Sequence, residues 1–273
     1  MVHKMKTKLK PILTSLLLAC GTAMAQTNDC ASLTHQALDL SGFNLTIDYM
    51  TSALASDQFI QQLRGRQDSE QFFNAIQPVL KKEFSGEILR RELQNRVAAL
   101  CNAEQMRQTV EKLQSPFIAR MLALEAATNS AEGQAKLQRY INIAQTAPPT
   151  DDRMEALEKL DESAGVSDFV TDFQMAMFTG ILTGAGAPKE ILDQIPLRRR
   201  EMKAQRQNYV ELGMSVTYHG VTRPELLQYA GELSTPPLKG FYSLVRKTFV
   251  EIVGERSQAM GRDLKPIIAP PTS

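Results

Sequence analysis

The sequence predicts an all-α protein, an array of helices built from two related helical-hairpin units with one disulfide bond. Residues that favour helices, such as Leu, Ala, Met, Glu and Gln, dominate the 273-residue chain, while tryptophan is absent and aromatic residues make up only 6%. Apolar residues recur at helical spacing in several segments. No segment alternates apolar and polar residues for long enough to predict a sheet.

The first 25 residues have the order of a cleaved secretory signal peptide. Four lysines precede a short apolar run, and Ala23-Met24-Ala25 places small residues at the two positions that a signal peptidase reads. The apolar run is too short to cross a bilayer, which needs about 20 residues. We therefore expect cleavage after Ala25 and a periplasmic or secreted protein whose mature chain has no transmembrane segment.

A lipid anchor at Cys20 is the alternative to simple cleavage. Residues 17–21 read Leu-Leu-Ala-Cys-Gly, which resembles a lipoprotein box. Two observations favour the soluble form. Lys10 lies close upstream and would leave an unusually short apolar region, and the Ala25 site just downstream is better formed.

Removal of the signal peptide also fixes the charge and the cysteine count. It leaves 27 basic and 30 acidic residues, a near-neutral balance with no general attraction for nucleic acid. Cys30 and Cys101 remain, and an oxidising compartment favours a bridge between them. In the chain-entropy model a loop of about 70 residues contributes roughly 4 kcal/mol. Two unrelated buried thiols are the alternative, and no C-x-x-C spacing suggests redox catalysis.

Amphipathic segments follow one another in the first half of the chain. Residues 33–54 carry apolar side chains at helical spacing, with an interruption near Gly42. Residues 72–80 form a second apolar stripe, in which Pro78 would kink the helix or end its first turn. Residues 88–100 form a third helix with a clear apolar face that leads into the second cysteine.

The best linker candidate is residues 147–150, Ala-Pro-Pro-Thr. We therefore expect an N-terminal helical unit over residues 26–147 and a C-terminal helical unit over residues 148–255. A proline-containing tail, residues 256–273, is expected to be flexible.

The C-terminal unit is expected to contain a central core helix. Residues 154–160 predict a short helix, and residues 169–182 form the most apolar segment of the chain. Asp172 and Gln174 interrupt that segment, which predicts a core helix and not a membrane span. Three glycines are expected to end it: Gly180, Gly184 and Gly186. Residues 209–216 belong to a further helix.

An internal repeat at an offset of 120 residues is the most informative feature. Residues 102–105 align with 222–225, and both have the form of a capping box. Ser115-Pro116 and Thr235-Pro236 each predict a new helix start, because proline at the first helical position lacks only an N–H that would be unpaired anyway. Apolar positions stay in step: Met106 with Leu226, Leu113 with Leu233, Ile118 with Leu238, Met121 with Phe241, Leu124 with Leu244. Chance similarity between helical hairpins is the alternative.

The second copy resembles the C-terminal segment of exported proteobacterial proteins that carry the domain of unknown function 2059. The resemblance rests on Glu225-Leu226, Tyr229, Leu233, Thr235-Pro236 and Lys239-Gly240-Phe241, and residues 113–116 echo it in the first copy. It is partial, because Leu238 stands where the family has glycine and Glu232 replaces an aromatic residue. The resemblance implies a helical envelope protein and brings no established activity and no catalytic residues.

The sequence offers no catalytic, cofactor-binding or metal-ligating set, so we expect no cofactor. Only His35 and His219 remain after cleavage, and no H-E-x-x-H spacing occurs. His219 is better explained as a partner of a helix dipole than as a base. Adjacent acids such as Asp151 and Asp152 point about 100° apart on a helix and do not form a shared acid–base site.

One dense basic cluster lies at the start of a predicted helix. Its members are Arg198, Arg199, Arg200, Lys203 and Arg206. Such a cluster would suit an anionic partner, such as phospholipid headgroups or an acidic protein face. The interpretation that we favour is a solvated surface whose charges pair with Glu190, Asp193 and Glu201.

Together these features favour a non-enzymatic interaction or binding protein of the bacterial periplasm, with an envelope protein or lipid as its partner. The many methionines could line an adaptable apolar groove. A hydrolase is the first alternative, and it would require two carboxylates, or a histidine and a carboxylate, to converge in a cleft. A carrier of an apolar ligand is the second, and it would require a cavity larger than about 300 Å³.

Overall fold

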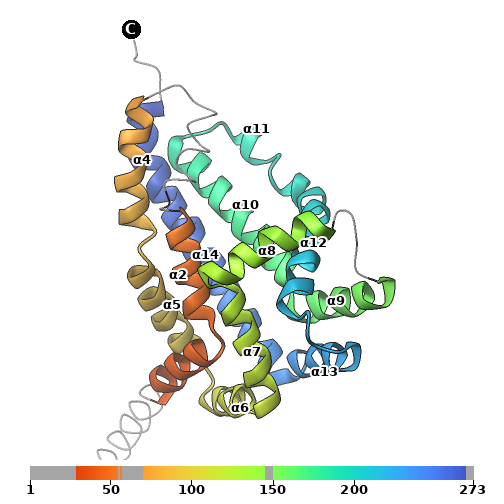
Figure 1. Cartoon of the computed structure of the whole chain (residues 1–273). Coiled ribbons are helices and arrows are strands. Elements are labelled where there is room, and N and C mark those ends of the chain that lie inside the picture. The colour runs from red at the N-terminus through yellow and green to blue at the C-terminus, as the bar shows by residue number, and fades with distance from the viewer. Residues whose placement is uncertain (1–28, 55, 57–69, 145–149, 269–273) are drawn as a thin grey trace, which may run out of the picture.

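A computed structural model of the chain describes residues 29–54, 56, 70–144 and 150–268 (Figure 1). These residues form helices and short connections without a strand, so the predicted all-α class is confirmed. No helix among them combines the length and the apolar character that a bilayer crossing requires. The expected signal peptide, Cys20 and most of the expected linker lie outside the described residues.

Two long helices form the centre of the molecule. Helix α10 (Val166–Ala185) lies against α14 (Pro236–Ile268) over most of its length (Figure 1). The ring of Phe173 in α10 stacks on that of Phe249 in α14, with 6.2 Å between their centroids and an angle of 7° between their planes. Phe249 is almost fully buried, so this contact lies in the hydrophobic core.

Glycines bring the backbones of α10 and α14 into contact. A Cβ atom on Gly184 would lie 2.1 Å from the carbonyl oxygen of Gln258, and one on Gly261 would lie 2.2 Å from that of Ile181. The expectation that Gly180 and Gly184 end the helix is therefore wrong, because both lie inside α10 where α14 passes. Only Gly186, with a φ of 83°, ends it.

Four described helical segments cover one flank of α14. They are the helical residues 29–40, α2 (Phe43–Leu54), α4 (Glu70–Glu83) and α5 (Gly86–Leu100). Helices α4 and α5 contact α14, and α2 contacts α5. The buried face of α5 consists of Leu89, Leu93 and Val97, as its apolar spacing predicts. Pro78 lies inside α4, which continues past it to residue 83.

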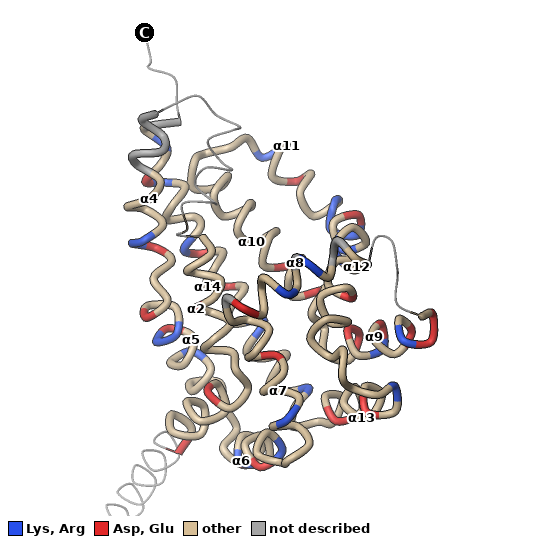
Figure 2. Tube along the Cα trace, in the orientation of Figure 1, with Lys and Arg blue, Asp and Glu red and all other residues tan. Residues whose placement is uncertain are grey.

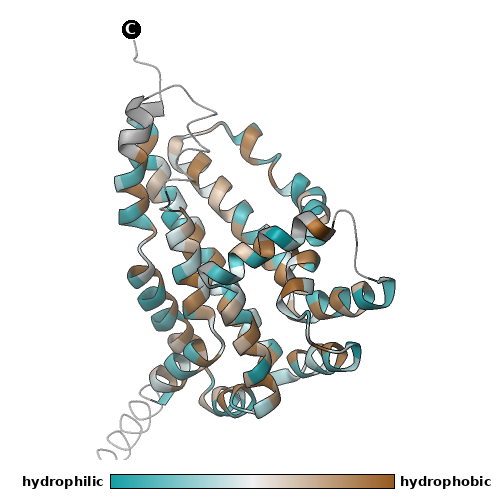
Figure 3. Ribbon diagram, viewed as in Figure 1, coloured by the Kyte–Doolittle hydropathy of each residue, from teal (hydrophilic) through white to brown (hydrophobic). Residues whose placement is uncertain are grey.

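The other flank is built from helices that pack on α10 and α12. They are α8 (Ala131–Ala144), α9 (Asp151–Ala164), α11 (Lys189–Leu192), the 3₁₀ turn Pro196–Arg198 and α12 (Arg199–Thr217). Helix α12 contacts α10, α9, α8 and α7 (Pro116–Thr128), and α9 packs against α13 (Arg223–Leu233). Along α9 and α13, hydrophobic and hydrophilic residues alternate as expected for helices with one buried face (Figure 3).

The predicted repeat is present as a pair of matching helical hairpins. Helices α6 (Ala103–Leu113) and α7 (Pro116–Thr128) begin 120 residues before α13 (Arg223–Leu233) and α14. Equivalent positions are buried in both copies: Met106 and Leu226, Val110 and Ala230, Leu113 and Leu233, Ile118 and Leu238, Met121 and Phe241. The helix starts expected near residues 102, 115, 222 and 235 are confirmed.

The two copies contact each other reciprocally, as the halves of a symmetric dimer do. Lys112 forms an ion pair of 2.8 Å with Glu232, its own equivalent in the second copy. The Thr109 hydroxyl donates to the carbonyl oxygen of Pro237 at 3.1 Å, and the equivalent pair, Tyr229 and Phe117, brings its ring centroids to 6.4 Å. A pseudo-two-fold axis therefore passes beside the Lys112–Glu232 pair.

Only the second copy has a complete capping box. The Thr222 backbone N–H donates to the Glu225 carboxylate at 2.8 Å. In the first copy Asn102 accepts from the backbone N–H of Gln105 at 3.0 Å, but the Gln105 side chain forms no return hydrogen bond within the described structure. The expected capping box at residue 102 is thus half formed, because a neutral amide attracts an N–H less strongly than a carboxylate does.

The two expected units share one hydrophobic core. Buried residues from α5, α6 and α7 pack in the same cluster as buried residues from α9, α13 and α14. The expectation of a flexible tail from residue 256 is wrong as far as Ile268, because α14 continues to that point and Met260 and Leu264 are buried. Residues 269–273 lie outside the described part of the chain.

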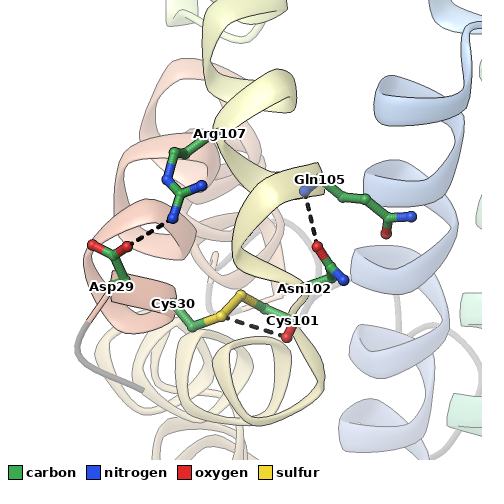
Figure 4. The surroundings of a disulfide bond; sticks show 6 residues. All are labelled: Asp29, Cys30, Cys101, Asn102, Gln105 and Arg107. Atoms are coloured by element: carbon green, nitrogen blue, oxygen red, sulfur yellow. Dashed lines mark hydrogen bonds and ion pairs between the residues drawn. A yellow bond between two sulfur atoms is a disulfide. The ribbon is translucent and has the colours of Figure 1, made fainter. Parts of the chain in front are cut away.

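The predicted disulfide joins Cys30 and Cys101, whose Cα atoms are 6.0 Å apart (Figure 4). It ties the helical residues 29–40 to the connection between α5 and α6. Beside it, Asp29 forms a 3.0 Å ion pair with Arg107 of α6 (Ala103–Leu113) (Figure 4). In the second copy the buried Val221 takes the place of Cys101, so the disulfide is a feature of the first copy alone.

Candidate ligand cavity

A cavity of about 270 Å³ lies where the second hairpin meets α2, α7, α9, α10 and α12. Its apolar walls come mainly from Phe43, Val166, Phe169, Met214 and Leu233. Its polar lining consists of Ser41, Thr46, Glu125, Thr128, Asn129, Thr217, Tyr218, Tyr229, Tyr242 and Arg246. One carboxylate, one guanidinium and three phenols therefore meet in a single cavity.

The carboxylate of Glu125 is held by two phenols. Its Oε1 atom accepts hydrogen bonds from Tyr218 at 2.6 Å and from Tyr229 at 2.7 Å. The two rings lie edge to face with 6.2 Å between their centroids, which fixes both donors. Burial raises the pKa of Glu125, and the two phenol hydrogen bonds oppose that rise. Burial, and then the charge of Glu125, raise the pKa of both tyrosines well above the usual value.

The guanidinium of Arg246 is held by rings and not by acids. It lies 5.3 Å from the ring centroid of Tyr242 and 5.9 Å from that of Phe169, within the range of cation–π contacts. In the described part of the chain no group forms a hydrogen bond or an ion pair with it. Burial lowers the pKa of Arg246, whereas Tyr242 and Glu125 oppose that fall.

Gly165 makes room for this arginine. It connects α9 to α10 with a φ of 61°, a backbone conformation that glycine adopts without strain. A Cβ atom there would also lie 2.8 Å from Nη1 of Arg246. The turn therefore requires glycine, and the small residue also leaves room for the arginine side chain.

Glu125 and Arg246 face the same cavity without touching. Each affects the other electrostatically, yet no oxygen of Glu125 lies within 4.0 Å of a nitrogen of Arg246. Oε2 of Glu125 and the hydroxyl of Tyr242 also lack hydrogen-bond partners among the described residues. Asp161 is buried nearby, where it accepts the Ser167 backbone N–H at 2.9 Å and adds negative potential at Arg246. Glu125 thus offers a hydrogen-bond acceptor to the cavity, and Arg246 offers hydrogen-bond donors.

The serine and threonine hydroxyls in the lining donate to the backbone. Each donates to a carbonyl oxygen three or four residues earlier: Ser41 to Leu38, Thr46 to Gly42, Thr128 to Leu124 and Thr217 to Gly213. A serine or threonine nucleophile needs instead a base that takes its proton. The hydroxyls therefore present only oxygen lone pairs to the cavity.

The residues that a hydrolase would use do not converge here. His35 is exposed and pairs at 3.5 Å with Asp39 one turn along its helix, and His219 is exposed beyond the end of α12. Glu125 is the single carboxylate among the described residues that line the cavity. The described residues also include no group of three or more His, Cys, Asp or Glu side chains placed to hold a metal ion.

The basic cluster at residues 198–206 is partly neutralised within the fold. Arg199 pairs with Asp172 at 2.7 Å and with Asp168 at 2.9 Å, and Lys203 pairs with Asp168 at 2.9 Å. Pairing was expected, but the partners are on α10 and not among Glu190, Asp193 and Glu201. The reason is that α12 packs along α10. Arg198, Arg200 and Arg206 remain exposed in a region of mixed charge (Figure 2).

A second hollow, an open apolar groove of about 600 Å³, lies between α10, α11 and α12. Its lining includes Phe178, Leu182, Ile191, Ile195 and Met202, with Glu190, Gln194 and Arg198 also present. Phe178 is 52% exposed and Ile191 is 50% exposed, so this apolar surface is accessible. The groove and the basic cluster meet at Arg198.

The sequence interpretation missed the residues of the cavity, although the repeat contains a signal for them. Glu125 aligns with Val245, which is fully buried, so a carboxylate occupies a core position of the repeat. Tyr229 aligns with the buried Thr109. A charged residue at a core position calls for a partner, and comparison of the two copies could have identified it.

Comparison with known proteins adds no relative: no protein-family model, curated protein or solved structure matches the chain. The resemblance to the domain of unknown function 2059 therefore stays a prediction that rests on the residues of the second copy alone.

Proposed function

We propose that the protein is an exported, non-enzymatic binding protein of the cell envelope, and that the cavity around Glu125 and Arg246 holds its ligand. The observation that carries this proposal is the guanidinium of Arg246. A charge that is partly removed from water is costly unless it is paired and hydrogen-bonded. Arg246 is half-buried, with two aromatic rings beside it and no acceptor among the described residues, so a bound acceptor would complete its environment.

Binding without catalysis accounts best for the groups in the cavity. The carboxylate of Glu125 is tied to two phenols, and the lining hydroxyls donate to their own helices. A general base needs a proton within reach and a nucleophile needs a base. The cavity offers recognition groups and no such pair.

Two observations, the leader sequence and the disulfide, support an exported location. The leader sequence up to Ala25 has the pattern of a signal peptide. The Cys30–Cys101 disulfide is of the kind that persists in oxidising compartments. Both features fit a periplasmic protein.

Native mass spectrometry of the protein purified without denaturation tests the proposal. Ala164 lines the cavity and is 9% exposed, so Ala164→Leu would fill part of the space without adding charge. Ala119 is exposed on α7, and Ala119→Leu is the matched control. We expect a bound small molecule on the wild type and on Ala119→Leu, and its loss from Ala164→Leu with the melting transition retained. A bare protein mass for the wild type, or an adduct that Ala164→Leu leaves in place, would contradict the proposal.

Carriage of an apolar ligand is a second candidate, favoured by the open groove between α10, α11 and α12. At about 600 Å³ it exceeds the size that such a ligand needs. Binding of a fluorescent fatty acid to the wild type and to Ile191→Gln tests it. Saturable binding that Ile191→Gln weakens tenfold would support this function, and equal binding by both proteins would exclude the groove.

A further inference from the structure

We propose that the ligand of the central cavity is a small zwitterion with an apolar side chain, built like an apolar α-amino acid. Its carboxylate would bind Arg246, its ammonium would bind Glu125, and its side chain would lie against the apolar walls. This inference rests on the proposed function and names the ligand class for the same cavity.

Arg246 supplies the site for the carboxylate. A guanidinium has five N–H donors in a rigid plane, and a carboxylate accepts two of them in parallel. The rings of Tyr242 and Phe169 flank the group at 5.3 and 5.9 Å and hold it without using its donors. All five donors therefore stay available to an acceptor in the cavity.

Glu125 supplies the site for the ammonium. Both phenol hydrogen bonds go to Oε1, which leaves Oε2 as a free acceptor. The hydroxyl of Tyr242 lines the cavity without a partner in the described structure and can accept or donate beside it. A primary ammonium has three donors, which these two oxygens can accept.

The charges favour a ligand of both signs over a simple ion. A lone cation would meet the positive charge of Arg246, and a lone anion would meet the negative potential of Glu125 and of the buried Asp161. A zwitterion satisfies each charge and brings no net charge into the core. Glu125 and Arg246 do not close into an ion pair of their own, which leaves the space between them for such a group.

The size and the apolar walls of the cavity indicate which side chain the ligand carries. A volume of about 270 Å³ is the space of roughly nine liquid water molecules at about 30 Å³ each, which suits a molecule the size of leucine or phenylalanine. Phe43, Val166, Met214 and Leu233 provide apolar contact. A polar side chain placed against these four residues would have no hydrogen-bond partner in them.

Titration calorimetry with L-leucine and L-phenylalanine as probes tests the inference on the dialysed mature protein with its disulfide intact. L-Leucinamide lacks the carboxylate and N-acetyl-L-leucine lacks the ammonium. We expect saturable binding of at least one amino acid and at least tenfold weaker binding of both derivatives of leucine. Arg246→Met and Glu125→Gln should each weaken binding at least tenfold, whereas the surface control Glu251→Gln should bind as the wild type does.

Two results would overturn the inference while leaving the proposed function in place. One is a bound molecule in native mass spectrometry, lost in Ala164→Leu, that carries only one charge or none. The other is a derivative that binds as tightly as its parent amino acid. If no probe binds and the wild type carries no ligand in mass spectrometry, the proposed function fails together with the inference.

Discussion

At the scale of single residues, the cavity depends on how Glu125 and Arg246 keep ionisable groups inside a helical core. Two phenols hold the carboxylate and two rings hold the guanidinium, so neither needs the other as a partner. The cost of burial shows in both groups, because the pKa of Glu125 is raised and that of Arg246 is lowered. Both side chains are half-buried, and a ligand that contacts them in the folded state would stabilise the protein.

Glu125→Gln should stabilise the ligand-free protein at neutral pH. Burial raises the pKa of Glu125 above 4.5, so the folded state favours the protonated form. That preference contributes fully below about pH 4.5 and is lost as the pH rises through the folded pKa. Glutamine is neutral and still accepts from both phenols. Thermal melts followed by circular dichroism should give a higher Tm for the variant at pH 7 and equal values near pH 4. A Tm that falls at pH 7 would mean that the charge of Glu125 stabilises the fold.

At the scale of helices, the contact between α10 and α14 relies on the absence of side chains. Gly184 and Gly261 meet the backbone of the facing helix at distances that a Cβ atom cannot adopt. The sequence analysis assigned Gly184 to a helix end, because glycine usually interrupts a helix. Whether a glycine ends a helix or lets a second helix approach closely depends on tertiary packing. The local sequence around the glycine does not specify that packing.

Gly184→Ala should therefore lower the free energy of unfolding by about 2 kcal/mol or more, as overpacked cores do. Its Cβ atom would meet the carbonyl oxygen of Gln258 at 2.1 Å, so the helices would have to separate. Gly240 lies in α14 with nothing near a Cβ atom, and Gly240→Ala should raise the same free energy by about 0.5–1 kcal/mol. Urea unfolding of both variants measures the difference. Equal effects would refute the close approach of the two helices.

The complete capping box of α13 should give Glu225 a stabilising role with the opposite pH dependence to Glu125. Hydrogen bonds from the Thr222 side chain and backbone, and then one from Arg120, lower the pKa of Glu225 to about 2. The contribution is present above about pH 4.5 and is lost as the pH falls towards 2. Glu225→Gln should lower the Tm at pH 6–7 and have little effect near pH 2.5. Gln105→Ala is the matched control in the first copy and should change the Tm little at either pH. A pH-independent loss in Glu225→Gln would contradict the ionic origin of the effect.

At the scale of the whole molecule, two hairpins are related by a pseudo-two-fold axis, and α14 of the second hairpin also forms the centre of the molecule with α10. The Lys112–Glu232 pair and the reciprocal contacts of Thr109 and Tyr229 define that relation. The cavity departs from it, since Glu125 and Arg246 align with Val245 and Ala126. The two charged residues of the cavity therefore have no charged equivalent in the other copy of the repeat.

Reduction of the Cys30–Cys101 disulfide should destabilise the protein without unfolding it at room temperature. The bridge closes a separation of 71 residues, for which the chain-entropy model gives roughly 4 kcal/mol. For a chain of this size, that corresponds to a fall in Tm of roughly 10 °C. Thermal melts with and without dithiothreitol measure it, and Cys101→Ser should melt at the lower temperature in both conditions. An unchanged Tm on reduction would show that the contacts beside the bridge, such as Asp29 with Arg107, suffice alone.

Much of the fold follows from local patterns in the sequence, whereas the cavity does not. Apolar spacing predicts the buried face of α5, and the capping and Ser/Thr-Pro signals predict where α6, α7, α13 and α14 begin. The parity of the cysteines predicts the disulfide. The cavity requires α2, α7, α9, α10, α12 and the second hairpin to meet, and spacing along one helix does not say which helices face each other.

A crystal structure of the protein, purified without refolding and at a resolution that separates water from other molecules, would show whether the cavity is a ligand site. We expect a compact bound molecule in the cavity, with an acceptor on the guanidinium of Arg246 and a donor on Oε2 of Glu125. A direct ion pair between Arg246 and Glu125, with the cavity closed around it, would show that these residues pair with each other and bind no ligand.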